Sequence, residues 1–149
     1  MSEITKKEEG IFLMLFNRNG YVLNFSTADF DVFTTNSIGV ALCNKYGLSK
    51  GKSLIAYLNS ATYNEREKLL LDLFHYYEDN MQHEYDKDYE DFSCYNRYDE
   101  RYARIYQKCK GIVEKIESTS SVITQTADNL KRKFSSEYMT QQIELMVSM

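Results

Sequence analysis

No proline occurs anywhere in the 149 residues of this chain. Proline interrupts helices because it lacks a backbone N–H and its ring clashes with the preceding turn. The chain also has only six glycines, so little in the sequence forces a helix to end. With 43% hydrophobic and 27% charged residues, the composition is that of a globular domain. We therefore predict a compact, predominantly all-α fold.

Helix-start signals divide the chain after residue 25. They are serine, threonine or asparagine residues that can cap a first turn: Ser26, Asn36 or Ser37, Ser49 or Ser53, and Thr62. Gly47 should end the second of these helices in a left-handed conformation. At Thr62 the signal is clearest, because Glu65 completes a capping box. It opens a helix whose apolar stripe follows helical spacing: Leu69, Leu70, Leu73, Phe74 and Tyr77.

Residues 11–25 allow two interpretations. The apolar run Ile11–Phe16 and the later YVLNF could pair as a short β-hairpin around Asn19-Gly20, which supplies positive φ angles. They could instead form a short buried helix that stops at Asn19-Gly20 and continues as an extended arm. The pattern favours the helix, because a hairpin needs a third strand and none is evident.

A change of character after residue 77 predicts a second region. Seven of the fourteen residues from 78 to 91 are acidic, which indicates a loop or a frayed helix end. A long helix should then run from about Tyr95 to Ser118, with further helices over 122–134 and 136–149. We accordingly expect two domains, 1–92 and 93–149. The long helix carries a heptad-like stripe that is a candidate interface: Tyr98, Tyr102, Ile105, Cys109, Ile112 and Ile116.

Several functional classes find no support in the sequence. The three cysteines, Cys43, Cys94 and Cys109, have neither disulfide nor zinc-site spacing, and we interpret them as reduced thiols of a cytoplasmic protein. The two histidines, His75 and His83, match no metal motif and are expected in solvent. No apolar run is long enough to span a membrane. We expect no metal, no cofactor and no membrane partner.

The segment YGLSKGKSL (46–54) ends in Gly-Lys-Ser, as a phosphate-binding loop does. That loop needs four residues between its glycines, whereas Gly47 and Gly51 enclose three. The residues before it predict a helix and not the buried strand that a phosphate-binding loop follows. We therefore interpret the segment as a helix end followed by a polar turn.

Basic side chains around this turn form a candidate phosphate or nucleic-acid patch. Lys50 and Lys52 are expected near a helix N-terminus, where free backbone N–H groups attract anions. Arg18 and Lys45 could join them, and so could arginines of the long helix: Arg97, Arg101 and Arg104. The net charge of −4 shows that any such patch is local.

Tyrosine is concentrated in the middle of the chain, with nine of thirteen between residues 63 and 106. A tyrosine offers a large contact area and a polar tip, which suits a core margin or a protein interface. Interleaved with arginines, tyrosines could also stack on nucleic-acid bases. The sequence leaves these three interpretations open.

The segments FNRNGYVLNFSTADFDVF, KYGLSKGKSL and KLLLDLFHYYE together resemble the N-terminal region of bacterial abortive-infection (Abi, AbiJ-like) proteins of anti-phage defence. The tail FSSEYMTQQIELMVSM is similar to the segment that leads, in such proteins, into a C-terminal HEPN-type ribonuclease domain. The resemblance covers most of the chain and implies that catalysis belongs to an Arg-four-residues-His motif. No histidine follows five positions after Arg18, Arg66, Arg97, Arg101 or Arg104.

The resemblance therefore implies a non-catalytic sensor or regulatory module, with the ribonuclease domain absent from this chain. An apolar stripe reaches Met149 without a helix cap, which we interpret as a chain cut at the domain junction. Expected partners are its own effector domain or a protein trigger. Two alternatives are an RNA-binding module that delivers substrate to the ribonuclease, and a helical scaffold that forms a homodimer through the 98–116 stripe.

Overall fold

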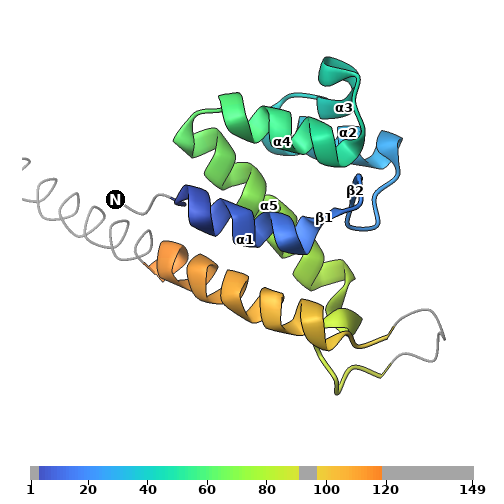
Figure 1. Ribbon diagram of the computed structural model, residues 1–149, viewed down its shortest axis with the longest axis vertical. Coiled ribbons are helices and arrows are strands. Elements are labelled where there is room, and N and C mark those ends of the chain that lie inside the picture. Colours follow the sequence, from blue (N-terminus) through green and yellow to red (C-terminus); the bar gives the residue numbers. More distant parts are fainter. Residues whose placement is uncertain (1–3, 91–96, 119–149) are drawn as a thin grey trace, which may run out of the picture. The chain divides into compact units, whose positions relative to one another are not determined.

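The computed structural model describes residues 4–90 and 97–118, and these are predominantly helical, as predicted. The helices before residue 85 are α1 (Lys6–Phe16), α2 (Thr27–Ile38), α3 (Leu42–Tyr46), α4 (Lys50–Ser60), α5 (Tyr63–Asn80) and the short 3-10 helix η1 (Gln82–Glu84). A hairpin of β1 (Asn17–Arg18) and β2 (Tyr21–Val22) follows α1. One more helix occupies residues 100–118 (Figure 1).

Both interpretations of residues 11–25 are partly correct. A capping box at Thr5 and Glu8 starts α1, which continues to Phe16. The hairpin is confined to residues 17–22, with Asn17 opposite Val22 in an antiparallel pair. Asn19 and Gly20 have φ angles of 55° and 90°, as a tight hairpin turn requires.

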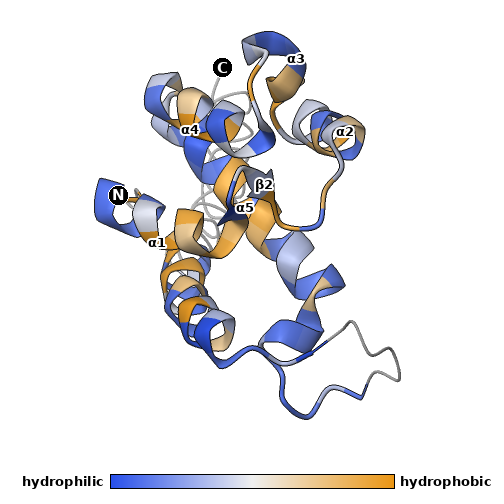
Figure 2. Cartoon of the chain, turned by 45° about the vertical axis from the view of Figure 1, so that its right-hand side comes forward, coloured by the Kyte–Doolittle hydropathy of each residue, from blue (hydrophilic) through white to orange (hydrophobic). Residues whose placement is uncertain are grey.

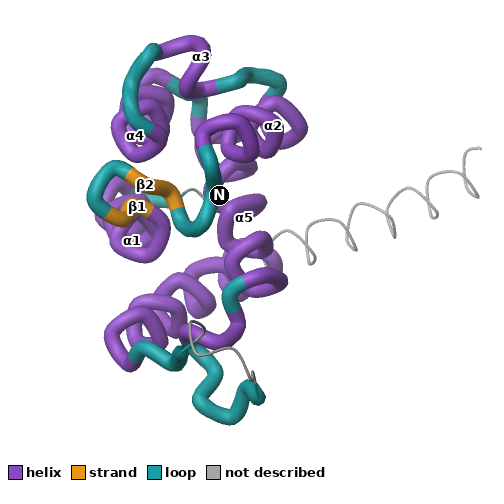
Figure 3. Tube along the Cα trace, turned by 90° about the vertical axis from the view of Figure 1, so that its right-hand side faces the viewer, coloured by secondary structure: helices purple, strands orange, loops and turns teal. Residues whose placement is uncertain are grey.

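Helix α4 supports this hairpin in place of a third strand. Figure 3 shows the two strands beside α1 and α4. The Gly51 backbone N–H donates to the Gly20 carbonyl at 2.9 Å. A Cβ atom on Gly51 would lie 2.6 Å from Oδ1 of Asn17, so glycine permits this close approach.

The predicted helix start at Asn36 or Ser37 is wrong. Ser26 caps α2, which runs through both residues and ends at Gly39 with φ 75°. Helix α3 starts only at Leu42, and its first turn is capped by α2. The Asp31 carboxylate accepts from the Cys43 N–H at 2.7 Å and from the Asn44 N–H at 3.1 Å. The left-handed conformation predicted for Gly47 is confirmed, with φ 65°.

The start signals of α4 and α5 are confirmed. Ser49 accepts from the Lys52 N–H, and Thr62 accepts from the Glu65 N–H. The other half of the expected capping box is replaced, because the Glu65 carboxylate accepts from the Tyr57 hydroxyl at 3.3 Å. All of the stripe predicted for α5 is buried: Leu69, Leu70, Leu73, Phe74 and Tyr77.

One part of the core forms where α1, α5 and the first part of helix 100–118 meet. Phe12 of α1 packs edge-on against Phe74 of α5, and Phe74 stacks on Tyr106 with ring centroids 5.5 Å apart. The Cys109 thiol reaches the Ile11 carbonyl at 3.8 Å. In Figure 2 the hydrophobic residues of α1 and α5 face each other, while the segment after α5 is hydrophilic.

Helix 100–118 starts later than the sequence predicts. It begins at Glu100 and not at Tyr95, because Asp99 accepts from the N–H groups of Arg101 and Tyr102 and so caps the first turn. The compact unit extends to Val113, and residues from Glu114 onward belong to another unit. Phe74 and Tyr106, which stack on each other, lie on opposite sides of the boundary expected at residue 92.

Some predictions lie outside the described residues, namely the helices over 122–134 and 136–149, and Cys94. Cys43 and Cys109 are buried free thiols. Burial raises the pKa of Cys109 to about 12, and burial followed by the charge of Asp31 raises the pKa of Cys43. None of the helices within 4–90 and 97–118 combines the length and the apolar character that crossing a membrane requires.

Candidate functional site

Arg18, predicted as an anion ligand, is bound within the chain. Its guanidinium forms two hydrogen bonds to the carboxylate of Glu84, both 2.7 Å long, and Nε donates to the Leu15 carbonyl at 3.2 Å. The side chains of this ion pair are 16% and 13% exposed. The guanidinium carbon also lies 3.8 Å from the centroid of the Tyr102 ring. These contacts join the hairpin to η1 and to helix 100–118.

The ion pair perturbs the ionisation of its neighbours. Burial lowers the pKa of Arg18, but the hydrogen bonds and charge of Glu84 outweigh burial and raise that pKa above its ordinary value. The Tyr77 hydroxyl donates to Glu84 at 3.1 Å. Burial, reinforced by the charge of Glu84, holds the pKa of Tyr77 far above its ordinary value. Tyr77 and Arg18 therefore both stay protonated at neutral pH.

A tyrosine cluster lies beside this ion pair. The rings of Tyr85 and Tyr106 stack with centroids 3.7 Å apart, and Tyr77 lies 5.9 Å from Tyr106. The Tyr106 hydroxyl donates to the Glu78 carboxylate at 2.6 Å, and the Tyr85 hydroxyl donates to the Glu78 carbonyl. These rings are therefore packed against one another, as the core-margin interpretation of the tyrosine-rich region expected.

The lysines of the YGLSKGKSL segment do not converge on one site. Lys50 is only 8% exposed, and its ammonium lies 4.7 Å from the Tyr21 ring centroid, so it packs against the hairpin. Lys52 and Lys45 are exposed. The first backbone N–H groups of α4 are already used, since Gly51 donates to Gly20 and Lys52 donates to Ser49.

The arginines of the predicted long helix are all exposed at its start. Arg97 precedes the first turn. Arg101 lies over the Tyr102 ring at 4.6 Å, so Arg18 and Arg101 are brought to the same tyrosine. Arg104 forms an exposed ion pair with Glu100 at 3.5 Å. Of these basic candidates, Arg18 and Arg101 thus share the Tyr102 ring, whereas Lys45, Lys50 and Lys52 lie on α3 and α4.

The stripe predicted as a dimer interface is largely buried within the chain. Ile105, Cys109 and Ile116 are at most 8% exposed, and Tyr102 and Ile112 are half-buried. Tyr98 is the exception, with 44% exposure. Cys109 of this stripe contacts α1 through the Ile11 carbonyl, so this part of the heptad-like spacing serves packing within the chain.

The histidines lie on the margin of the same region. His75 approaches Glu78 at 3.3 Å, and the His83 ring contacts Tyr89. Within the described part of the chain, three or more His, Cys, Asp or Glu side chains nowhere gather in a group that could hold a metal ion.

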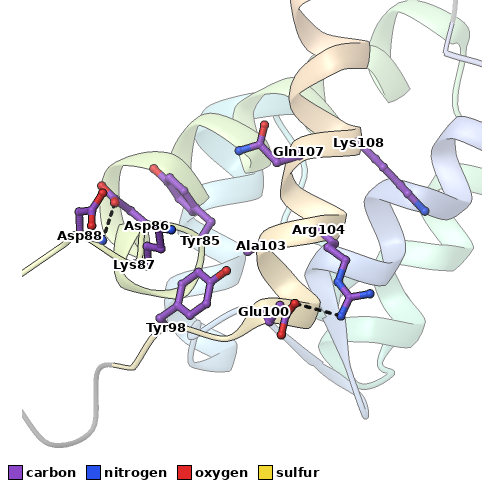
Figure 4. Close-up of a pocket in the computed structure, with 10 residues that line it drawn as sticks. All are labelled: Tyr85, Asp86, Lys87, Asp88, Tyr98, Glu100, Ala103, Arg104, Gln107 and Lys108. Carbon is purple, nitrogen blue, oxygen red and sulfur yellow. Dashed lines mark hydrogen bonds and ion pairs between the residues drawn. The ribbon is translucent and has the colours of Figure 1, made fainter.

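Two surface hollows flank the start of helix 100–118. The larger, about 560 Å³, has Tyr85, Tyr98 and Ala103 along its length and charged side chains of both signs around it. In Figure 4, Tyr85 and Tyr98 lie between the turn at residues 86–88 and the helix, and Arg104 reaches Glu100. The smaller, about 260 Å³, lies on the other flank, against the hairpin.

Sequence reasoning missed Glu84, the residue that anchors Arg18. It lies 66 residues from its partner, within the acidic run that the sequence indicates as a loop or a frayed helix end. Asn17 and Asn19 were also missed as lining residues of the smaller hollow. Their only local signal was the hairpin turn, which says nothing about the helix that completes the hollow.

Comparison with known proteins leaves the family open. No protein-family model, no curated protein and no solved structure matches the chain.

Proposed function

We propose that this chain is a non-catalytic sensor or regulatory module of an abortive-infection defence protein, and that it controls a separate ribonuclease domain. The sequence resemblance supports the family and the presence of such an effector. The contact that carries the regulatory role is the Arg18–Glu84 ion pair, with Tyr102 stacked on the arginine.

Regulation requires an element with two arrangements that a ligand can bias. The Arg18–Glu84 pair joins the hairpin to the start of helix 100–118, and a single contact of this kind can be made or lost. The helix continues past Val113, the last residue of the compact unit, toward the part of the chain where the resemblance places the link to the ribonuclease. Loosening the pair would therefore act on the element closest to the effector.

The test uses the gene that encodes this chain together with the coding sequence that follows it. Cells that carry the wild type, Glu84→Gln or Glu100→Gln are challenged with phage, and plaques and uninfected growth are measured. We expect Glu84→Gln to change protection or to arrest growth without phage. Glu100→Gln, which removes an exposed carboxylate from the same region, should behave as wild type.

Two results would contradict the proposal. One is unchanged protection and growth after deletion of residues 1–118, because a controlling module cannot be dispensable. The other is multiple-turnover cleavage of RNA by the purified 149-residue chain, because the proposal assigns catalysis to another domain.

RNA delivery is a second candidate, favoured by the exposure of Arg101 and Arg104 and by Tyr98, which lines the larger hollow together with Arg104. This candidate loses support because Arg18 is paired with Glu84 and Lys50 packs against the Tyr21 ring. Electrostatic RNA binding should fall steeply with salt. A mobility-shift titration at two salt concentrations tests it, and no retardation of RNA at low salt would remove this candidate.

The dimerisation scaffold keeps less support, because most of its proposed interface is buried in the chain itself. Light scattering at high micromolar concentration addresses it. A dimer that persists after Tyr98→Ser would need a surface other than the 98–116 stripe.

A further inference from the structure

The smaller hollow is lined by hydrogen-bond donors from two distant segments. Asn17, Arg18 and Asn19 line it from the hairpin, and Arg101 and Tyr102 line it from helix 100–118. Fixed donors that converge on one small space are what an oxyanion requires.

The charge of this hollow differs from that of two other surface hollows among the described residues. Its lining includes no carboxylate. The hollow beside Tyr98 is bordered by Asp86, Asp88 and Glu100, and a third between α2 and α5 is bordered by Asp72 and Asp79. Glu84 neutralises Arg18, so the charge of Arg101 is the excess positive charge of the smaller hollow.

Three of the donors have no partner within residues 4–90 and 97–118. The Arg101 guanidinium contacts the Tyr102 ring but neither a carboxylate nor a carbonyl there. The side-chain amides of Asn17 and Asn19 likewise make no hydrogen bond in that part of the chain. An incoming anion could therefore bind these groups without breaking an existing bond.

Arg18 supplies a donor that is already fixed in place. Its two terminal guanidinium nitrogens donate to Glu84, its Nε donates to the Leu15 carbonyl, and the guanidinium packs on the Tyr102 ring. A side chain held in this way loses little conformational freedom when a ligand arrives. The Arg101 guanidinium also contacts the Tyr102 ring, with its central carbon 4.6 Å from the ring centroid.

We propose that this hollow binds a phosphoryl group, with Arg101, Asn17 and Asn19 as ligands beside the fixed guanidinium of Arg18. A phosphoryl group offers several acceptor oxygens and matches the guanidinium fork. The volume of about 260 Å³ equals that of roughly eight waters at about 30 Å³ each, which is enough for a phosphate and a small part of its parent molecule. Met14 and Ile105 line the rest of the hollow and would contact that part.

Binding by this chain does not depend on the proposed regulatory role. Only the further step, that a phosphorylated compound is the regulatory ligand, rests on that proposed function. Phosphate binding with no effect on the ribonuclease would count against the regulatory role alone, and regulation without phosphate binding would count against this site alone.

The experiment is an NMR titration of the 149-residue chain with inorganic phosphate and with pyrophosphate at constant ionic strength. We expect saturable shifts at the amides of residues 17–20 and 101–105. Arg101→Gln should weaken binding by about tenfold, because it removes a charge-assisted hydrogen bond. Asn19→Asp should abolish binding, because it places a carboxylate in the hollow while aspartate still tolerates positive φ.

Arg104→Gln is the matched control. It removes the same charge from an exposed arginine of the same helix, but on the flank of the larger hollow. The affinity of this variant for phosphate should stay within twofold of the wild-type value, because Arg104 does not line the smaller hollow. Equal weakening by Arg101→Gln and Arg104→Gln would indicate non-specific attraction and would overturn the proposal, as would the absence of saturable shifts.

Short RNAs with and without a 5′-phosphate distinguish the sources of the group. Tighter binding of the phosphorylated RNA, lost in Arg101→Gln, would identify an RNA end as the source. Binding of free phosphate without this preference would identify a small molecule. A third result would overturn the site: free phosphate gives no saturable shifts, and RNA binds regardless of its terminal phosphate and shifts the amides of other residues.

Discussion

Replacing Glu84 by glutamine tests how strongly the Arg18–Glu84 pair stabilises the compact unit. Glutamine keeps the shape of the side chain but leaves the Arg18 guanidinium, 16% exposed, without its counter-charge. Removing one partner of a buried pair costs about 3–5 kcal/mol. Both side chains here keep some contact with water, so we expect the free energy of unfolding to fall by about 2–4 kcal/mol.

A double-mutant cycle isolates the contribution of the pair itself. Urea denaturation of Arg18→Gln, Glu84→Gln and the double variant should give a coupling energy of about 2 kcal/mol. The Glu100–Arg104 pair is the control, because its side chains are 72% and 74% exposed. Its cycle should give less than about 0.5 kcal/mol. Equal coupling energies for the two pairs would refute the reasoning.

Three further predictions concern packing and ionisation. Leu73 is fully buried, so Leu73→Ala should lower the free energy of unfolding by about 2–5 kcal/mol in a denaturant titration, and an unmoved midpoint would show that the α5 stripe is assigned wrongly. Gly51→Ala should lower the free energy of unfolding by about 1–3 kcal/mol, because its Cβ would meet Asn17. Gly111→Ala has open space around it and should raise the free energy of unfolding by about 0.5–1 kcal/mol. A change of the same sign in both variants would contradict the Gly51–Asn17 contact. The pKa values of Tyr77 and Tyr106 are raised, so their contribution to stability is complete below about pH 10, the ordinary tyrosine pKa, and is lost as pH rises beyond it. Tyr106→Phe should flatten that alkaline loss in thermal melts, and an unchanged slope would count against the Glu78 contact as its cause.

Local signals predicted the fold well wherever a helix depends on its own residues. The stripe from Leu69 to Tyr77, the cap at Thr62 and the left-handed Gly47 follow from spacing and backbone preference alone. The start of α3 could not be found in this way, because its cap comes from Asp31 on the preceding helix.

The candidate site was harder to predict because it depends on distant residues. The sequence indicates Arg18 as a candidate anion ligand, but its partner Glu84 lies in an acidic run with no distinguishing pattern. The meeting of Arg18 and Arg101 at Tyr102 requires the hairpin and helix 100–118 to pack together, and no local pattern encodes that contact.

Native-state hydrogen exchange measures directly whether the first part of helix 100–118 and α5 form one cooperative unit held by the Arg18–Glu84 pair. The slowest amides of residues 101–113 and of 69–77 should share one opening free energy, and Glu84→Gln should lower both together. Fast exchange at 101–113 with α5 still fully protected would contradict this, and would favour a domain boundary near residue 92.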